Sequence, residues 1–233
     1  MKNKNIIIGI GRGVLVLVLL IAAIALPEKK EEKNYKEELL GIDYQVEGNE
    51  VSLDQYETEN PVVAMYIKNY GSVVMELYPD IAPNTVNNFI SLIKSSFYDD
   101  NTFHRLVPGF VLQGGDPDGT GAGGPDYSIK GEFTNNGFEN NLKHEKGVLS
   151  MARSSENDSA GSQFFIMLAD NDYLDGNYAT FGKVIDGFDI IEKIEKNERV
   201  ADSESGKLQN NLVLKKALVD LKGKEYPEVE KIS

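Results

Sequence analysis

The residues between Phe103 and Asp116 combine a cation, an aromatic ring and a primary amide in one short stretch, FHRLVPGFVLQGGD. The guanidinium of Arg105 carries a rigid fork of N–H donors and is positive at any working pH. Gln113 adds an amide that both donates and accepts hydrogen bonds. Beside the ring of Phe110, these groups would offer directed hydrogen bonds above an apolar floor. A solvated arginine and a core phenylalanine would explain the same residue types taken alone.

The turn inside this stretch predicts how its side chains are arranged. Pro108-Gly109 is a turn signal, so we expect a strand, a bend and a second strand. Side chains alternate between the two faces of a strand. Val111 and Gln113 should therefore share one face, with Phe110 at its edge, and Leu112 should point to the opposite side.

Hydrolytic and metal-dependent chemistry have weaker support. No Gly-x-Ser-x-Gly motif is present, and a Ser–His–Asp triad would have to use one of the two histidines, His104 or His144. Serines and acidic residues are common in the chain, so a chance trio carries little weight. The chain has no cysteine and no His-Glu-x-x-His motif, which excludes thiolate chemistry, disulfides and sulfur-based zinc sites. We expect no cofactor and no metal.

A glycine-rich segment, residues 116–125, follows the stretch. Asp116, Asp118, Thr120 and Gly121 match the first offsets of a calcium-binding loop, but its twelfth position is Tyr127 instead of a bidentate glutamate. No Gly-Lys-Ser/Thr sequence follows, which argues against a phosphate-binding loop. The segment is predicted to be a long loop without a bound ion.

Short β-branched and apolar runs separated by turn signals predict an all-β fold with two helices. This pattern is typical of a closed antiparallel barrel. On the first helix, Asn84, Asn87 and Asn88 are expected to face solvent. The predicted strands outside the Phe103–Asp116 stretch are residues 62–68, 72–77, 147–152, 162–168, 179–185 and 212–220, and the predicted helices are residues 83–94 and 187–196.

The N-terminal residues 1–26 have the pattern of an export signal. Basic residues precede a hydrophobic run, and Ala23-Ile24-Ala25 fits a cleavage site. Alternatively, residues 6–26 are long enough to anchor the chain, because a bilayer needs about 20 apolar residues. Both interpretations place the rest of the chain outside the cytoplasm, tethered to the membrane or secreted after cleavage near Ala25.

Composition sets further bounds on the chain. Residues 27–60 are polar and acidic, and we predict a mostly disordered linker with a short strand over residues 44–53. The net charge of −13 argues against nucleic acid as a partner, because phosphate binding needs clustered lysines and arginines. Only the N-terminal segment is expected to contact a membrane.

The stretch FHRLVPGFVLQGGD resembles the signature of the cyclophilin-type peptidyl-prolyl cis–trans isomerases. Residues 82–89, 149–152, 161–166 and 174–184 are similar to further motifs of that family and occur in the same order. The resemblance implies an eight-stranded barrel capped by two α-helices, over a domain of residues 61–222 with a polar tail at 223–233. It also implies isomerisation of X–Pro peptide bonds without a cofactor.

By position, the resemblance assigns catalysis to Arg105. The residues expected to contact the substrate are His104, Phe110, Val111, Gln113, Ala152, Arg153, Gln163, Phe165, Tyr173, Leu174 and Tyr178. Those expected to form the proline pocket are Phe110, Val111, Phe165 and Leu174. Those expected to hold the flanking peptide are Gln113, Gln163, Ala152 and the backbone of Arg153, with His104 supporting the site.

Four positions depart from residues that the family often has. Val111 stands where Met is common and shortens one wall of the pocket, and Tyr178 stands at a frequent His. Tyr173 replaces a Trp whose indole binds cyclosporin, so we expect reduced affinity for cyclosporin-like inhibitors. Arg153 replaces an Asn and adds positive charge, which would favour acidic substrates.

These observations predict an exported, membrane-associated prolyl isomerase that assists the folding of exported proteins, with X–Pro-containing polypeptides as partners. A non-catalytic receptor for proline-containing segments at the cell surface is the alternative, since it needs the apolar pocket but not Arg105. A structural surface domain with a vestigial pocket is the third hypothesis.

Overall fold

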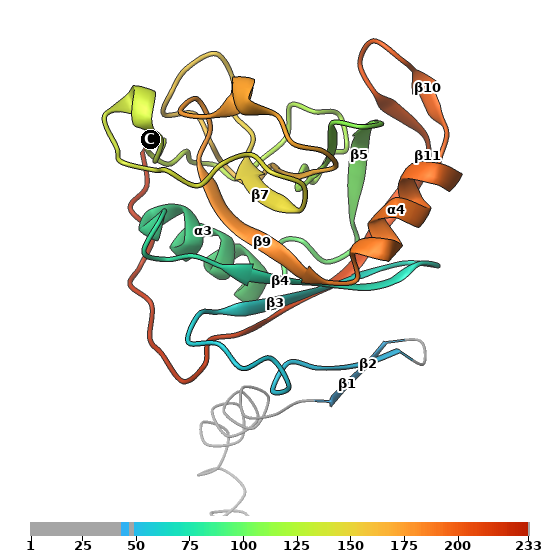
Figure 1. The fold of residues 1–233 in the computed structure, drawn as a ribbon, viewed down its shortest axis with the longest axis horizontal. Helices are drawn as coiled ribbons and strands as arrows, with labels where there is room; N and C mark the ends of the chain where they lie inside the picture. Colours follow the sequence, from blue (N-terminus) through green and yellow to red (C-terminus); the bar gives the residue numbers. More distant parts are fainter. Residues whose placement is uncertain (1–42, 47–48, 233) are drawn as a thin grey trace, which may run out of the picture. The chain divides into compact units, whose positions relative to one another are not determined.

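The computed structural model describes residues 43–46 and 49–232, and the following statements concern this part of the chain (Figure 1). The predicted hydrophobic segment, residues 1–26, and the first part of the predicted linker lie outside it. None of the helices in the described ranges is long and apolar enough to span a membrane. The strands are β1 (Asp43–Val46), β2 (Asn49–Ser52), β3 (Val62–Ile67), β4 (Gly71–Leu77), β5 (Asn101–Val107), β6 (Val111–Gly114), β7 (Val148–Met151), β8 (Phe164–Met167), β9 (Thr180–Asp186), β10 (Val200–Asp202) and β11 (Lys207–Asp220), and the helices are α3 (Pro83–Lys94) and α4 (Phe188–Asn197).

Nine strands form one antiparallel sheet in the order β10-β11-β3-β4-β9-β7-β8-β6-β5. An additional pairing of β11 with β5 closes this sheet, so eight strands make a ring and β10 is attached outside it. Closure removes the free edges that an open sheet would expose. The predicted eight-stranded antiparallel barrel with two helices is confirmed, and the helices lie to the left (α3) and right (α4) of it in Figure 1.

The barrel interior is filled by the apolar faces of the strands and of both helices. From α3 it receives Val86, Phe89, Ile90 and Ile93, at the helical spacing that the sequence shows. The ring of Phe89 makes edge or tilted contacts with Tyr98, Phe164 and Phe181, at centroid separations of 5.0–5.2 Å. Such aromatic pairs add stability beyond the area that they bury.

The predicted helix over residues 83–94 is confirmed, but the expectation for its asparagines is wrong for two of them. Asn87 and Asn88 are buried, and only Asn84 is partly exposed. The amide of Asn88 donates to the carbonyl of Gly161 (2.7 Å) and accepts from the hydroxyl of Tyr127 (2.8 Å). These hydrogen bonds satisfy the buried amide and tie α3 to the loops at its end of the barrel.

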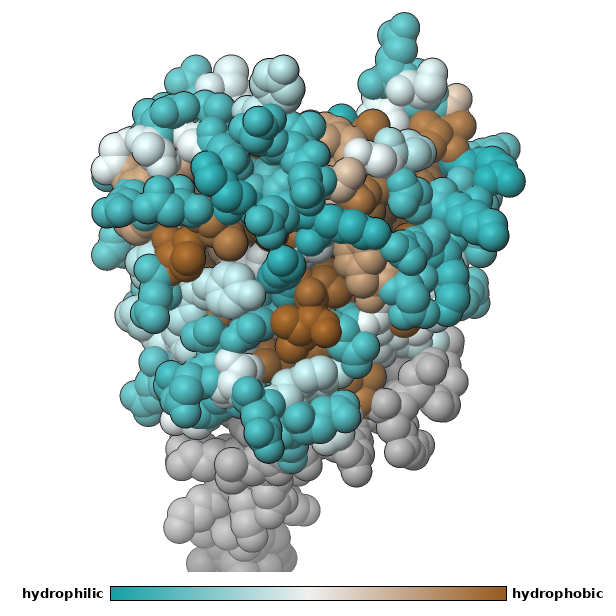
Figure 2. Space-filling model, in the orientation of Figure 1, coloured by the Kyte–Doolittle hydropathy of each residue, from teal (hydrophilic) through white to brown (hydrophobic). Residues whose placement is uncertain are grey.

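The chain on either side of the barrel also packs against it. The segment predicted as a strand over 44–53 forms the β1–β2 hairpin, and Leu53 joins Val62, Ala64 and Val74 in a small apolar cluster on the outer side of β3 and β4. At the other end, Ile232 bridges to Ser128, and Glu230 exchanges hydrogen bonds with Asn84. Most of the face in Figure 2 is hydrophilic, with smaller hydrophobic patches between the polar residues.

Candidate active site

The register of four neighbouring strands places the predicted residues on one outer face of the barrel. Arg105 on β5 is opposite Gln113 on β6, Gln113 is opposite Phe165 on β8, and Phe165 is opposite Ser150 on β7. Residues directly opposite each other in an antiparallel pair point to the same face. The next row, Leu106–Leu112–Ile166–Leu149, points inward into the core. The alternation predicted for Val111, Leu112 and Gln113 is thus confirmed.

A second apolar cluster, separate from the barrel core, covers this outer face. We call it the outer cluster; it consists of Val111, Val148, Phe165 and Met167, with Val107, Phe110, Leu142, Ala152, Leu174 and Tyr178 partly exposed around them. Phe165 and Val111 are buried at its floor. The ring of Tyr178 meets that of Phe165 edge-on, with centroids 5.9 Å apart. An apolar floor with a partly exposed rim suits a small apolar ring.

Arg105 lies next to the outer cluster and is held by neutral acceptors. Its Nε donates to the backbone carbonyl of Ser205 (2.9 Å), and its Nη1 donates to Oε1 of Gln113 (3.1 Å). Gln113 in turn donates to Gln163 (3.0 Å), which donates to the carbonyl of Gly123 (2.9 Å). The relay fixes the guanidinium from one side and leaves further N–H groups of the fork for a ligand.

No ion pair neutralises Arg105 within the residues that the structure describes. The side chain is neither fully buried nor fully exposed. A half-buried cation held by neutral groups keeps its full charge for a ligand, and partial desolvation strengthens its interactions. This is the arrangement that electrostatic stabilisation of a reacting group requires.

The glycine-rich loop is organised by the carboxylate of Asp116. Its oxygens accept hydrogen bonds from the backbone N–H groups of Asp118 (2.8 Å), Thr120 (2.9 Å) and Gly121 (2.5 Å). Burial opposes the charge on this carboxylate, but these donors outweigh it and lower the pKa of Asp116. Across the described ranges, no group of three or more acidic or histidine side chains could hold a metal ion. The loop flanks a cleft of about 490 Å³ that Gln113, Gln163, Ala152 and Arg153 also line.

Arg153 is packed against the rim instead of extending freely into solvent. Its guanidinium lies over the rings of Tyr178 and Phe133, at 4.8 and 5.2 Å from their centroids. Its Nε donates to the carbonyl of Asn177, and its Nη1 donates to the carbonyls of Ser154 and Ser155. The side chain therefore ties the loop after β7 to the segment that carries Tyr178.

Behind the outer cluster, His144 joins Asp175 and Ser150 in the connectivity of a catalytic triad. Nδ1 of His144 is 3.0 Å from Asp175, and Nε2 is 3.0 Å from Oγ of Ser150. His144 is 2% exposed and Ser150 is fully buried, so no substrate can reach the hydroxyl. Burial lowers the pKa of His144 and the hydrogen bond to Asp175 partly offsets this, which favours the neutral ring. The trio is a structural support: His144 stacks on Phe165, and Asp175 directly follows Leu174.

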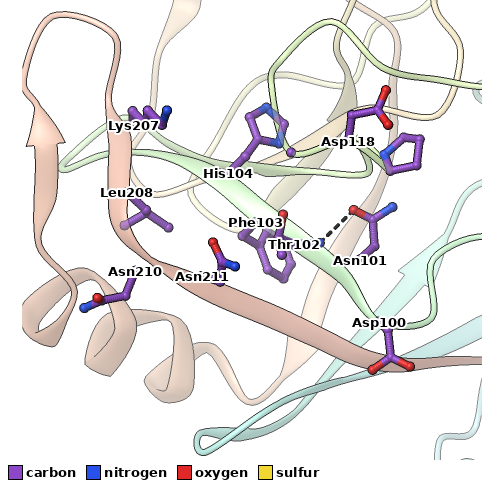
Figure 3. Close-up of a pocket in the computed structure, with 12 residues that line it drawn as sticks. Asp100, Asn101, Thr102, Phe103, His104, Asp118, Lys207, Leu208, Asn210 and Asn211 are labelled. Carbon is purple, nitrogen blue, oxygen red and sulfur yellow. Dashed lines mark hydrogen bonds between the residues drawn. The ribbon is translucent and has the colours of Figure 1, made fainter.

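Two predicted substrate residues lie apart from the outer cluster. The side chain of Tyr173 is 89% exposed, one residue before Leu174. His104 faces a second, polar cleft of about 280 Å³ between β5, the start of the glycine-rich loop and β11 (Figure 3). Both ring nitrogens of His104 are buried and have no hydrogen-bond partner among the described residues. Their roles in substrate binding stay predictions, as do those of the residues that the structure does bring together.

The residues that support the site from a distance are absent from the sequence prediction. Ser205 contributes only its backbone carbonyl to Arg105, and a carbonyl has no signature in the sequence. The link from His144 to Ser150 and Asp175 is visible only as three polar residues beside predicted strands. Their one sequence signal is that His144 is one of just two histidines in the chain.

Comparisons with known proteins agree with the geometry. The family model described as cyclophilin type peptidyl-prolyl cis-trans isomerase/CLD matches residues 62–219. The chain is 44% identical over 132 residues to peptidyl-prolyl cis-trans isomerase B of Bacillus subtilis, covering 57% of this chain and 89% of that protein. It is 42% identical over 132 residues to a peptidyl-prolyl cis-trans isomerase of Helicobacter pylori, covering 56% and 78%.

Other relatives are longer, and solved structures are similar in fold. The chain spans only 24% of the length of peptidyl-prolyl cis-trans isomerase-like 2 of Rhizopus delemar, at 46% identity over 133 residues, which is 57% of this chain. A crystal structure of a Cryptosporidium parvum cyclophilin type isomerase superposes with a TM-score of 0.60 at 33% identity, covering 69% of this chain and 97% of that one. A second structure of that protein, determined in the presence of the dipeptide Ala-Pro, gives the same TM-score at 34% identity and covers 68% and 98%.

Proposed function

Since this chain belongs to the cyclophilin-type peptidyl-prolyl cis–trans isomerase family, we propose that it isomerises X–Pro bonds at Arg105 and the outer cluster, and that its substrates are exported polypeptides. The observation that carries the proposal is the placement of Arg105. Its guanidinium lies beside an apolar cluster, is oriented by neutral acceptors and has no acidic partner among the described side chains.

The reaction needs no covalent step. Rotation about an X–Pro bond has a barrier of ~18–20 kcal/mol because it breaks the resonance of the amide. In the twisted state the proline nitrogen regains a lone pair, and Arg105 donates a hydrogen bond to it. The planar amide can hardly accept this bond, so the interaction stabilises mainly the transition state.

The size of the effect requires help from the outer cluster. Accelerating an exchange of ~100 s to ~10 ms is four decades, which is about 5.4 kcal/mol. A charge-assisted hydrogen bond contributes only roughly 1.5–3 kcal/mol. The remainder comes from clamping the proline ring against Phe110, Phe165 and Leu174 and from excluding water there. Ala-Pro was present with one of the similar structures, which supports proline-containing peptides as ligands.

The cellular role rests on the N-terminal sequence. A basic start followed by an apolar run indicates export, with residues 6–26 as anchor or the chain released near Ala25. X–Pro exchange limits the folding rate of many chains, so an isomerase in this location would assist the folding of exported proteins. Mass spectrometry of the mature N-terminus distinguishes anchor from cleaved signal, and an intact N-terminus recovered with the cytoplasmic fraction would contradict export.

The direct test is turnover of an X–Pro peptide by the full chain, with and without Arg105→Ala. Loss of the hydrogen bond should reduce kcat/KM by about 10–100-fold. Peptide affinity, followed by fluorescence, should change little because the outer cluster is intact. Peptide binding without turnover by the native protein would instead favour the receptor hypothesis, which the neutral relay around Arg105 also permits.

A further inference from the structure

The hairpin formed by β10 and β11 contacts the strand that carries Arg105. The carbonyl of Ser205 accepts from Nε of Arg105 (2.9 Å), and the carbonyl of Gly206 accepts from the backbone N–H of Leu106 (2.8 Å). Directly after the tip, Lys207 pairs with Arg105 in the sheet. Three consecutive residues of the hairpin therefore hold the side chain of Arg105 and the backbone of Arg105 and its neighbour Leu106.

The tip is itself held in one conformation by Asp202. Its carboxylate accepts from the N–H of Glu204 (3.0 Å) and from the hydroxyl of Ser205 (2.8 Å). Its carbonyl accepts from the N–H of Gly206 (2.8 Å). These bonds orient the peptide group whose oxygen meets Arg105, so the acceptor is positioned before any substrate binds.

Gly206 fits between the tip and β5 only because it lacks a side chain. A Cβ there would lie 2.9 Å from the carbonyl oxygen of Leu106 and 2.7 Å from Cγ2 of Val107. It would also lie 3.2 Å from Cγ of Arg105, and the residue has a φ of +75°. A larger residue must lift the tip away from β5. Gly223 has a similar φ of +71°, but a Cβ there would meet nothing within 4 Å.

A register shift in β11 brings the hairpin to this place. Between the pairs Lys207–Arg105 and Leu212–Phe103, β11 has more residues than β5, and the surplus bulges out of the ladder. In Figure 3, Leu208, Asn210 and Asn211 of this bulge line the polar cleft on the side opposite His104. The bulge lets the start of β11 leave the course of the barrel and cross to Arg105.

We propose that the tip of this hairpin, through the carbonyl of Ser205 and the close contact at Gly206, positions the guanidinium of Arg105 for catalysis. The guanidinium of Arg105 is held at two nitrogens: Nε donates to the carbonyl of Ser205 in the hairpin, and Nη1 donates to Gln113. Without the hydrogen bond at Nε, the guanidinium can rotate about its remaining hydrogen bond to Gln113. It then no longer points toward the proline nitrogen of the substrate. The hairpin contributes no residue to the outer cluster and meets it only at Cγ2 of Val107 on the rim, so the floor formed by Val111 and Phe165 stays in place for substrate binding.

The test compares Gly206→Ala with Gly223→Ala in the full chain. Both substitutions place a Cβ on a backbone with positive φ, but only the first displaces the tip. Because small displacements of a positioning group reduce rates strongly, kcat should fall about tenfold in Gly206→Ala relative to Gly223→Ala. KM should stay within about twofold, since the substrate contacts remain.

A second variant separates positioning from a folding defect. Asp202→Ala removes two bonds of the tip without adding a contact, and kcat should fall about threefold, with recovery in Asp202→Asn, whose amide oxygen can still accept a hydrogen bond. The ¹⁵N resonance of the Arg105 Nε–H group, assigned with Arg105→Lys, should shift in Gly206→Ala and Asp202→Ala but not in Gly223→Ala.

The outcomes distinguish this inference from the proposed function on which it rests. Equal kcat in Gly206→Ala and Gly223→Ala, with an unchanged Arg105 Nε–H resonance, would overturn the positioning role while leaving isomerisation intact. If the unmodified protein turns over no X–Pro peptide, the proposed function fails. The Nε–H resonance then still decides whether the tip holds Arg105.

Discussion

Two chains of hydrogen-bonded side chains flank Phe165 on the same outer face of the barrel. One, Arg105–Gln113–Gln163, is partly exposed and runs between a hairpin tip and the glycine-rich loop. The other, Asp175–His144–Ser150, is nearly closed to solvent. The second has the connectivity of a hydrolase triad and the first does not. Accessibility therefore indicates which of the two sets of side chains a ligand could reach, and connectivity alone does not.

The difference also sets what each chain contributes. A buried polar group that loses its partner is expensive, because water cannot replace the lost bond. A partly exposed group can be rehydrated, so its removal affects the fold little. The buried set around His144 should therefore contribute mainly to the free energy of unfolding. The partly exposed set around Arg105 should contribute mainly to the rate of isomerisation.

The largest expected effect is on stability, in the buried chain. His144→Ala leaves the hydroxyl of Ser150 without its partner and opens a cavity behind Phe165, so the free energy of unfolding should fall by about 3–4 kcal/mol. Gln163→Ala, in the exposed chain, should lower it by less than about 1 kcal/mol. Urea unfolding of both variants measures the two values. Equal losses of unfolding free energy in the two variants would contradict the different roles inferred for the buried and the partly exposed hydrogen-bonded side chains.

The next effect is on rate, in the exposed chain. Arg105→Lys keeps the charge but replaces the fork with a single ammonium, which cannot hold the Ser205 carbonyl and Gln113 in the same geometry. We expect kcat/KM to fall about tenfold, or about 1.4 kcal/mol, with the midpoint of urea unfolding nearly unchanged. Wild-type activity in this variant would mean that charge alone is sufficient and that the relay has no catalytic part.

Acid should destabilise the protein through its two histidines before its carboxylates respond. Burial lowers the pKa of both His144 and His104, partly offset by Asp175 and Asp116 respectively. Their unfolded forms bind a proton near pH 6.5, so the stability of the neutral forms is complete above that pH and is lost as pH falls toward the folded pKa. The lowered pKa values of Asp116 and Asp175 act only below about pH 4.

Urea unfolding between pH 7 and pH 5.5 should therefore show a loss on the order of 1 kcal/mol. His104→Gln should reduce the slope, because it removes one of the two groups that take up protons on unfolding. A stability curve that is flat over this interval, or one that rises toward acid, would contradict the buried neutral histidines.

Local patterns in the sequence were sufficient for most strands and both helices, whereas the residues assigned to the site came from the resemblance to a known family. The helix Pro83–Lys94 and the alternation at Val111–Gln113 depend on neighbours within a few residues, which the sequence displays directly. The start of β11 is missing from the prediction because Lys207–Asn211 is a mostly polar run without alternation, held by pairing with β10 and, at Lys207, with β5. The Ser205 carbonyl lies 100 residues from Arg105 along the chain and could belong to any residue type.

The smallest expected effect concerns Arg153, which lines a cleft with Gln113 and Gln163 and stacks on Tyr178 at the rim of the outer cluster. Its Nε and Nη1 are engaged by backbone carbonyls, so its influence on a substrate is the field of a half-exposed charge, screened by salt. Peptides with Glu before proline should be turned over about two- to threefold faster than those with Lys, a difference of about 0.5 kcal/mol.

Arg153→Gln should abolish this preference. Arg199→Gln removes the same charge from an arginine that also donates to backbone carbonyls, and this variant should retain the preference. Because salt screens the charge of Arg153, the preference should weaken at high salt. Overall turnover should persist, since the contact of Arg153 with Tyr178 at the rim remains. Equal turnover of acidic and basic peptides by the unmodified protein would show that this arginine only braces the rim.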